Sequence, residues 1–423
     1  MKQKVVIIGH SYSSRLSIIR SVAQIGCDVS VIVMAGFKRD GKTLNNKKPI
    51  DCYSKYVSHV YYCLRKDKEE LIRILLENCT DSQQKVVIFP DSDDTVAAID
   101  NNRERLAGHF YFPHICNGSG SIEYWMDKIH QKNMARSVGL NVADGIVINI
   151  KDGVYDIPDD MAYPCYTKPL ATMNGGKGGM HRCDNDTELK NALNEYITTR
   201  TRTGDVLVEE YKEIDTEYAL LGFSDGKEVV IPGMMQLLVI SKKNKGIALQ
   251  GKVMPVDGFE EIIDKFKQLV LSIGFVGVFD IDFYKSGNLI YFCEMNLRFG
   301  GSGYAITKMG CNLPAMMVQY FTGGDMANLK KHITGEAIYT NERMCLDDWT
   351  NGYITLDEYQ RYMKTADIHF IQDKDDPQPQ KAYQKVFFLQ RLIMPVKKRL
   401  SKLYLETRYK MIPGKGRVKR FGI

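Results

Sequence analysis

Short apolar runs alternate with helical patterns over the first hundred residues, and this alternation constrains the fold more than any other feature. The runs KVVIIG (4–9), DVSVIVM (28–34) and KVVIFP (85–90) are continuous, as expected of strands buried on both faces. Apolar residues from Leu16 onward recur at helical spacing between the first two runs. This order predicts a parallel sheet with right-handed crossovers. The first turn, GHSYSS, lacks the GxGxxG pattern, so the sheet is Rossmann-like without the dinucleotide fingerprint.

The net charge of +6 is unevenly distributed along the 423 residues. Residues 381–423 contain thirteen Lys or Arg against the single acid Glu406, so this segment carries +12 and residues 1–380 sum to −6. The basic character belongs to the tail, and we expect no nucleic-acid partner.

The ten cysteines form no CxxC pair, which favours free thiols in a reducing compartment. No apolar run approaches the roughly 18 residues that span a bilayer, and we expect a cytoplasmic protein.

Polar side chains alternate at the end of an apolar strand, NLIYFCEMNLR (288–298). Successive side chains of a strand point to opposite faces, so Glu294, Asn296 and Arg298 share one face. Three polar groups beside a run of glycines are unusual for a core strand. The pattern predicts either a half-exposed strand or an acid, an amide and a guanidinium directed at a common ligand.

A second acidic strand precedes this one. VGVFDIDFY (276–284) places Asp280 and Asp282 on one face, and the turn KSGN (285–288) predicts a hairpin between the two strands. Carboxylate and amide oxygens on adjacent strands suit Mg²⁺ that is bound through phosphates. Several acids placed together without a metal would repel one another. We therefore favour a metal site over a solvated strand edge.

A lysine and a glycine loop form a further candidate for phosphate binding. Lys168 closes the run YPCYTKPL, and the loop NGGKGG (174–179) follows with Lys177 inside it. Glycines let backbone N–H groups approach an anion closely. Taken alone, the segment favours the other interpretation, a hairpin turn that carries exposed lysines, because glycine loops are common.

Carboxylates follow another apolar strand in VLVEEYKEIDTEY (206–218). Glu209 and Glu210 end the strand, and Glu217 lies eight residues after Glu209. A nucleoside needs an acceptor for its amino group and another for its ribose hydroxyls, which these carboxylates could supply. The alternative is a solvated edge of alternating Glu and Lys, which the segment taken alone favours.

The order of these parts resembles the ATP-grasp superfamily. EMNLR matches its E-x-N-x-R element, DFY matches the strand before that element, and the lysine of DK (127–128) resembles its helix-opening lysine. YTKP and NGGKGG resemble its strand lysine and phosphate loop, and the spacing from Glu209 to Glu217 matches its adenine and ribose carboxylates. The resemblance covers about residues 1–330. It implies an ATP-grasp fold of the α/β and α+β class with an N-terminal Rossmann-like parallel-sheet domain.

The resemblance also implies domain boundaries and residue roles. The expected parts are a Rossmann-like domain at 1–114, an ATP-grasp domain at 115–330 with a lid at about 144–211 and a catalytic part at about 212–330, a C-terminal extension at 331–372, a linker at 373–380, and a basic amphipathic tail at 381–423. Lys128 and Lys168 would contact ATP phosphates, with Gly175, Gly176, Lys177 and Gly178 as a closing lid. Glu209 would lie at adenine and Glu217 at ribose, and Glu210 and Tyr211 would also belong to the nucleotide site. Asp282, Glu294 and Asn296 would hold one or two Mg²⁺, or Mn²⁺, and Arg298 would face the transferred phosphate, with Lys168 as a second catalytic residue.

The implied activity is that of an ATP-dependent carboxylate–amine ligase that forms ADP. GGSGYAIT after Arg298 departs from the biotin carboxylase pattern, so the resemblance is closer to D-aspartate ligase-like proteins. The expected partners are ATP, a small carboxylate and an amine, with an amino acid or a cell-surface precursor as substrate; a homodimer is left open. Two alternatives stay open: carboxylation or carbamoyl phosphate chemistry on bicarbonate, and a regulator that binds ATP without turnover.

The basic tail allows two interpretations. Apolar residues at positions 389, 392, 393, 396, 400 and 403 fall on one helical face, interrupted near Pro395. With the neighbouring lysines, this face could contact an anionic membrane at its inner side. The other interpretation, which we favour from the sequence, is that the apolar face packs on the acidic body of the protein.

Overall fold

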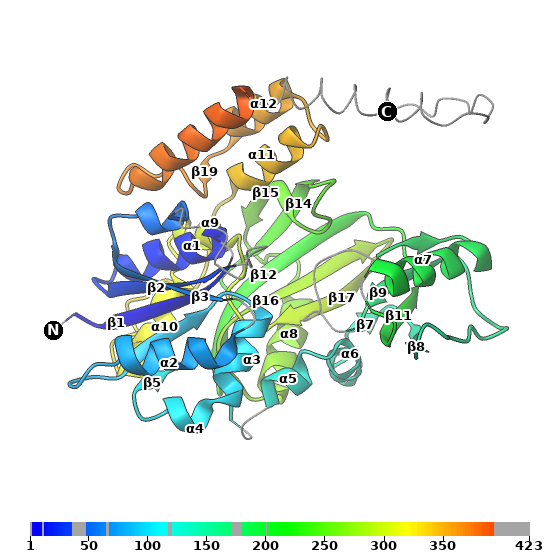
Figure 1. The fold of residues 1–423 in the computed structure, drawn as a ribbon, viewed down its shortest axis with the longest axis horizontal. Helices are drawn as coiled ribbons and strands as arrows, with labels where there is room; N and C mark the ends of the chain where they lie inside the picture. Colours follow the sequence, from blue (N-terminus) through cyan, green and yellow to red (C-terminus); the bar gives the residue numbers. More distant parts are fainter. Residues whose placement is uncertain are drawn as a thin grey trace.

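A computed structural model describes residues 2–10, 12–35, 48–64, 67–116, 121–170, 180–199 and 201–392. Its N-terminal part is a five-stranded parallel sheet of strand order β3-β2-β1-β4-β5 (Figure 1). The strands are β1 (Lys4–Gly9), β2 (Asp28–Ala35), β3 (Val57–Leu64), β4 (Val86–Pro90) and β5 (Phe110–Tyr111). The helices are α1 (Tyr12–Ala23), α2 (Lys68–Asn78), α3 (Asp93–Asn101) and α4 (Arg103–Leu106), with a short 3₁₀ turn at Asp51–Tyr53.

The predicted parallel sheet is confirmed, and its central strands are buried as their continuous apolar runs require. Ile7 and Ile8 of β1 and Val31 and Ile32 of β2 have no exposed surface. β3 was not predicted from the sequence, because its exposed residues make it unlike the central strands. β3 lies at the edge of the sheet, where one face meets solvent, so its sequence lacks the continuous apolar run of its neighbours.

A larger mixed sheet forms the centre of the molecule, with strand order β19-β18-β15-β14-β12-β16-β17-β7. Its strands are β7 (Asn141–Val142), β12 (Thr216–Asp225), β14 (Met234–Ile240), β15 (Ala248–Met254), β16 (Phe275–Ser286), β17 (Leu289–Asn296), β18 (Ala337–Thr340) and β19 (Ile368–His369); β6 (His114–Ile115) pairs with β16 and β13 (Val229–Val230) with β12. Helices α5 (Ser121–Trp125), α6 (Lys128–Ser137), α8 (Glu260–Ser272), α9 (Gly303–Lys308) and α10 (Leu313–Thr322) pack around it.

One face of β16 is apolar and the other carries polar residues, so burial of the apolar face determines where the polar residues point. Phe279, Ile281 and Phe283 pack with α8 and α6 in one core cluster. The opposite face begins with the buried Val278, which packs with α9 and α10 and with the N-terminal sheet, and continues with Asp280. The hydrophobic cores of the N-terminal sheet and of the central sheet are therefore joined, and the polar part of β16 faces the space between them.

A separate four-stranded antiparallel sheet lies on the side of the molecule away from the N-terminal sheet (Figure 1). Its strands are β8 (Gly145–Ile150), β9 (Cys165–Pro169), β10 (Arg182–Cys183) and β11 (Gly204–Glu210), covered by α7 (Asp186–Thr199). This sheet has its own small core around Leu189 and Leu193 of α7. It therefore contacts the rest of the chain mainly through the strand ends that carry Lys168 and Glu209.

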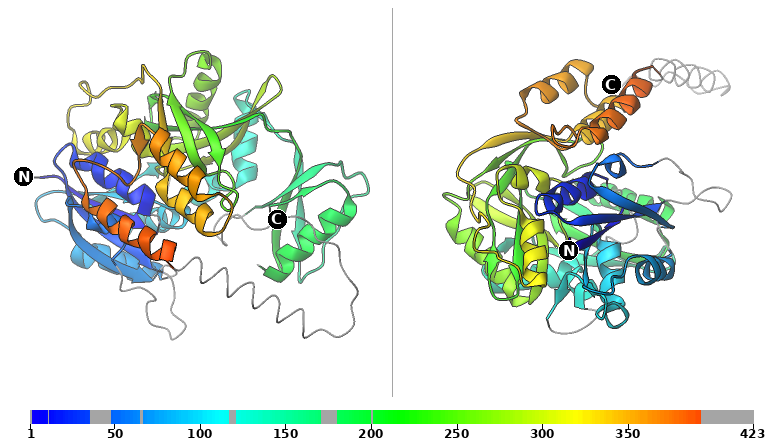
Figure 2. Two further views of the ribbon diagram at one scale, coloured as in Figure 1. Left: turned by 90° about the horizontal axis from the view of Figure 1, so that it is seen from above. Right: turned by 90° about the vertical axis from the view of Figure 1, so that its left-hand side faces the viewer.

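The C-terminal helices form a layer beside α1, most clearly seen from above (Figure 2). They are α11 (Glu342–Thr350), α12 (Leu356–Thr365) and a helix at residues 378–392. Their shared core contains Trp349 and Tyr359. Within the part of the chain that the structure describes, no helix combines the length and apolar character needed to cross a membrane.

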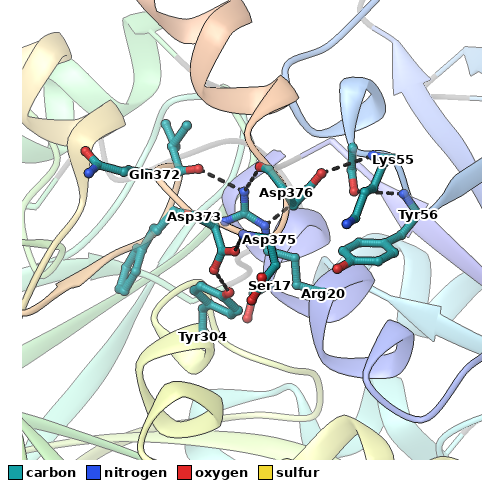
Figure 3. A network of polar contacts seen from close by, with 12 residues as sticks. Ser17, Arg20, Lys55, Tyr56, Tyr304, Gln372, Asp373, Asp375 and Asp376 are labelled. Atoms are coloured by element: carbon teal, nitrogen blue, oxygen red, sulfur yellow. Dashed lines mark hydrogen bonds and ion pairs between the residues drawn. The ribbon is translucent and has the colours of Figure 1, made fainter.

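The segment 373–380 is not the exposed linker that the sequence led us to expect. Asp376 is fully buried and bonds to Arg20 of α1, with Nε lying 3.0 Å from Oδ2 (Figure 3). Arg20 also donates to the carbonyl oxygens of Phe370, Ile371 and Asp376 at 2.8–3.1 Å. Asp373 accepts hydrogen bonds from Tyr304 and from Lys308. Asp373 and Asp376 therefore attach this segment to the rest of the protein through buried contacts, while Asp375 between them is exposed.

Replacing Arg20 with Met should lower the free energy of unfolding by about 3–5 kcal/mol, because it leaves the buried Asp376 carboxylate and three carbonyls without their donor. The denaturant midpoint measures this change. Arg73→Met is the matched control, since Arg73 pairs with Glu77 on the exposed side of α2 and should contribute less than about 1 kcal/mol. Equal midpoints for the two variants would show that the Arg20 network does not stabilise the fold.

Candidate active site

The hairpin of β16 and β17 carries four oxygen-bearing side chains in register. Asp282 lies opposite Glu294, and Asp280 lies opposite Asn296. The hairpin turns at Gly287, which has φ +58, as the KSGN sequence predicts. All four residues are partly exposed on the face directed towards the N-terminal sheet. The structure thus brings together the residues that the sequence analysis proposed as metal ligands.

Arg298 lies just beyond β17 and joins this face to the N-terminal sheet. Its Nε donates to Oδ1 of Asp93 at 2.9 Å, and its Nη2 donates to Oδ1 of Asn296 at 3.2 Å. Burial disfavours the charged guanidinium, but the negative charges of Asp93, Asp280 and Glu294 raise the pKa of Arg298 above its ordinary value. Asp93 was not identified from the sequence. It is the first residue of α3, after the N-cap Ser92, and an acid in the first turn of a helix is common because it complements the helix dipole.

The glycines after Arg298 allow the layers to approach closely. A Cβ at Gly300 would collide with the Asp280 carboxylate. A Cβ at Gly301 would lie 3.4 Å from Oγ of Ser14 in α1. The glycine run therefore lets the loop after β17 pass between the hairpin and the N-terminal sheet.

Lys128 reaches the same face from the first turn of α6. Asp127 is the N-cap of this helix and accepts from the backbone N–H groups of Ile129 and His130 at 2.8 and 3.2 Å. The ammonium of Lys128 lies 2.9 Å from Oε2 of Glu294. Burial opposes the charge, but the Glu294 carboxylate outweighs it and raises the pKa of Lys128. The expected helix-opening lysine thus pairs with an expected metal ligand.

Gln131 holds α6 and β17 together and was missed from the sequence. Its side-chain amide donates to the carbonyl of Met295 at 2.7 Å and accepts from the N–H of Met295 at 2.9 Å. These two bonds fix the backbone between Glu294 and Asn296. A small pocket opens there, lined by Asp93, Met126, Lys128, Gln131, Glu294, Met295 and Asn296. The pocket is therefore bounded by groups from three separate segments.

Glu209 lies buried between two lysines. Its Oε2 is 2.6 Å from the ammonium of Lys168 on β9, and its Oε1 contacts the ammonium of Lys132 on α6. Only 2% of Glu209 is exposed. Lys132 was not predicted, although its place one helical turn after Lys128 could have indicated it. Burial and the nearby Lys168 ammonium lower the pKa of Lys132 to about 7. In this structure Glu209 thus pairs with the strand lysine, Lys168, and its expected place at adenine stays a prediction.

The remaining nucleotide candidates lie at the end of β11 in the four-stranded sheet and at the start of β12 in the central mixed sheet. Glu210 accepts from the N–H of Asp144 and pairs with Lys212 at 2.8 Å. The guanidinium of Arg182 lies over the ring of Tyr211, 4.4 Å from its centroid. Glu217 on β12 lies opposite Tyr284 of β16, which places it on the same face as Asp282. Gly175, Gly176, Lys177 and Gly178 lie outside the described residues.

The side-chain oxygens of the β16–β17 hairpin suit a cation whose remaining ligands come from a bound phosphate and from water. Among the residues that the structure places, no three His, Cys, Asp or Glu side chains form a ready-made metal group. Asp282, Glu294 and Asn296 supply two carboxylates and one amide oxygen on adjacent strands. Mg²⁺ is commonly held by one or two carboxylates and completed by phosphates and water. The donor set therefore suits Mg²⁺ that arrives with a nucleotide.

Comparison with known sequences identifies the central region. Residues 133–315 match the model of the ATP-grasp domain. The carbamoyl phosphate synthase large chain of Clostridium acetobutylicum is 21% identical over 213 residues, a match that covers 49% of this chain and 20% of that protein. The alignment thus spans about one fifth of the length of this relative.

Solved structures agree on the fold over most of the chain. The biotin carboxylase domain of Hydrogenobacter thermophilus 2-oxoglutarate carboxylase, in complex with Mg-ADP, ADP and bicarbonate, aligns with a TM-score of 0.60 at 18% identity over 80% of this chain and 74% of that chain. An L-amino acid ligase from Bacillus licheniformis aligns with a TM-score of 0.57 at 16% identity over 80% and 79%. The protein therefore has an ATP-grasp fold with an N-terminal parallel-sheet domain.

The lowered pKa of Lys132 predicts a pH-dependent stability. Between about pH 7 and about pH 10 the unfolded chain, with Lys132 at its ordinary pKa, binds more protons than the folded chain. The stability of the protein relative to its Lys132→Met variant should therefore rise with pH above 7, by roughly 1 kcal/mol per pH unit. Unfolding of both proteins at several pH values measures this difference.

Lys267→Met is the matched control, because the side chain of Lys267 on α8 is 38% exposed and pairs with Asp264 at the surface. The stability difference between the protein and this control should not change over the same pH range. A constant difference for Lys132→Met as well would show that Lys132 keeps an ordinary pKa.

Proposed function

We propose that this ATP-grasp protein is an ATP-dependent ligase that activates a carboxylate as an acylphosphate and couples it to an amine. The observation that supports this most is the convergence of Lys128, Asp282, Glu294, Asn296 and Arg298 on one face. Two carboxylates, one amide and two cations in this arrangement suit a magnesium-bound triphosphate beside a second substrate. The proposed substrates are small molecules, with an amino acid or a cell-surface precursor as the carboxylate or the amine.

The cations of the site are held in ion pairs that a nucleotide can replace. Lys128 pairs with Glu294, and Lys168 pairs with Glu209. When Mg-ATP binds, Glu294 would join Asp282 and Asn296 in holding Mg²⁺, and Lys128 would pair with a phosphate. The exchange keeps the local charge balanced, because each released group meets a new partner of opposite sign. Glu210, Tyr211 and Glu217 would lie at the nucleoside, at the edge between the sheets.

The reaction needs no protein nucleophile. A carboxylate oxygen attacks the γ-phosphorus of ATP, the bond to the β-phosphate breaks, and an acylphosphate and ADP form. The amine then attacks the acyl carbon, phosphate leaves, and the amine loses a proton. Mg²⁺, when bound, supplies positive charge for the phosphates. Arg298, kept charged by Asp93, would stabilise the transferred phosphoryl group during both steps.

Bicarbonate is the second candidate for the carboxylate. The structure of the Hydrogenobacter thermophilus carboxylase domain contains bicarbonate with Mg-ADP, and the matched Clostridium protein is a carbamoyl phosphate synthase. In this case the phosphoryl group would pass to bicarbonate and carboxyphosphate would form. The same residues of this chain would serve either reaction, so only the substrate distinguishes them.

The test is ADP release by the purified full chain with Mg-ATP, with Mn²⁺ assayed in parallel. Panels of amino acids and other carboxylates are added singly and in pairs with amines, and bicarbonate is added alone. Release that requires a carboxylate and an amine together, with formation of their amide, supports the ligase. Release with bicarbonate alone supports the second candidate. Nucleotide binding without turnover across the panel contradicts both and supports a regulator.

Glu294→Gln and Asp282→Asn should each lower turnover about a hundredfold or more with the fold retained, because each removes a charge that would hold Mg²⁺. Turnover is measured over a range of Mg²⁺ concentrations, and circular dichroism checks the fold. Asp264→Asn is the control, since Asp264 lies exposed on α8. Near-normal turnover of either hairpin variant at limiting Mg²⁺ would remove that residue from the metal site.

Asp93→Asn should lower kcat about tenfold while the KM for ATP changes less than about twofold, because Arg298 loses the charge that holds it in place. The neighbouring Asp94 pairs with Lys68 at 3.1 Å, away from Arg298, so Asp94→Asn is the matched control and should keep normal kinetics. Equal kinetics for the two variants would mean that Asp93 does not position Arg298.

A further inference from the structure

The C-terminal helix at residues 378–392 attaches to the body through one face only. The side chain of Tyr383 is buried and its hydroxyl donates to the carbonyl of Glu342 at 2.6 Å. One turn later, Phe387 stacks on Trp349 and on Tyr359, with ring centroids 5.2 and 5.1 Å apart. These contacts fix the rotation of the helix about its own axis. They therefore determine which of its residues point away from the protein.

The outward face of this helix is apolar at its end and basic at its start. Phe388, Leu389 and Leu392 are 61%, 54% and 57% exposed. Lys381 and Lys385 are also exposed. The five positions follow helical spacing, opposite to Tyr383 and Phe387, so they form a single stripe. Leu389 and Leu392, which the sequence led us to place against the body, lie in solvent instead.

We propose that this stripe, defined by Lys381, Lys385, Phe388, Leu389 and Leu392, docks on an anionic lipid surface. Large apolar side chains that are more than half exposed in a cluster are costly in water and insert readily at a membrane interface. The two lysines on the same side would contact lipid phosphates. The sequence that follows adds the basic run KKR at 397–399, and residues 381–423 together carry +12. This charge complements an anionic membrane.

Two other occupants fit the stripe less well. The body of the protein cannot cover it in the described arrangement, because the opposite face of the helix makes the contacts with α11 and α12. A second copy of the same stripe would bring four lysines together across a symmetric interface, and like charges oppose such pairing. An anionic lipid surface satisfies the apolar residues and the lysines at once.

The test is co-sedimentation of the full chain with vesicles of phosphatidylcholine, with and without phosphatidylglycerol. The protein should bind the anionic vesicles, and added salt should weaken binding. Phe388→Gln with Leu392→Gln should lower the bound fraction about tenfold, and Lys381→Gln with Lys385→Gln should lower it several-fold. Val154→Gln is the matched control, because Val154 is 73% exposed on another part of the molecule, and should bind normally.

Each contrary outcome overturns the proposal. Protein that stays in the supernatant with anionic vesicles at low salt shows that the stripe does not bind lipid. Binding that the Phe388 and Leu392 substitutions leave unchanged assigns the contact to another segment. A dimer in gel filtration that these substitutions abolish, without vesicle binding, assigns the stripe to a second copy of the chain. Nucleotide binding, measured for every variant, verifies that the body remains folded.

Discussion

The register of the β16–β17 hairpin is the constraint on which the rest of the site depends. Asp282 faces Glu294 only in this pairing, and a shift of one residue would turn the carboxylates into the core formed with α8. The apolar face prevents such a shift, because Phe279, Ile281 and Phe283 must stay buried. A bulge follows at Cys293, where the register between Asp282 and Phe283 is interrupted. The packing of the core thus fixes the position of every oxygen on the opposite face.

Features that depend on residues close together in the sequence could be predicted, whereas contacts between residues far apart in the sequence could not. The alternation of Glu294, Asn296 and Arg298, the hairpin turn and the start of α6 at Lys128 are local patterns, and the structure contains all three. Asp93 and Arg298 are 205 residues apart, and Gln131 and Met295 are 164 apart. No periodicity links such pairs, so these contacts could not be predicted. The segment 373–380 was expected to be a linker, because amino-acid composition does not distinguish acids that will be buried from acids that will be exposed.

Positive charges in the site are matched by carboxylates before any ligand binds. Lys128 faces Glu294, Lys168 faces Glu209, and Arg298 faces Asp93. Partners of opposite sign lower the cost of keeping ions away from bulk water. Two of these pairs join different layers, α6 with β17 and the loop after β17 with α3, whereas β9 and β11 are neighbours in one sheet. The ion pairs of Lys128 and Arg298 therefore neutralise the site and also join two parts of the fold.

The buried contact between Arg20 and Asp376 has a consequence for how the chain acquires its structure during synthesis. The two residues are 356 positions apart, and the core that includes Ile18 and Ile19 also contains Phe370. While the ribosome is still making the middle of the protein, α1 lacks the groups that cover its outer side. Contacts this distant in sequence form late and slowly. The outer side of α1 therefore reaches its final packing only after Phe370 and Asp376 have left the ribosome.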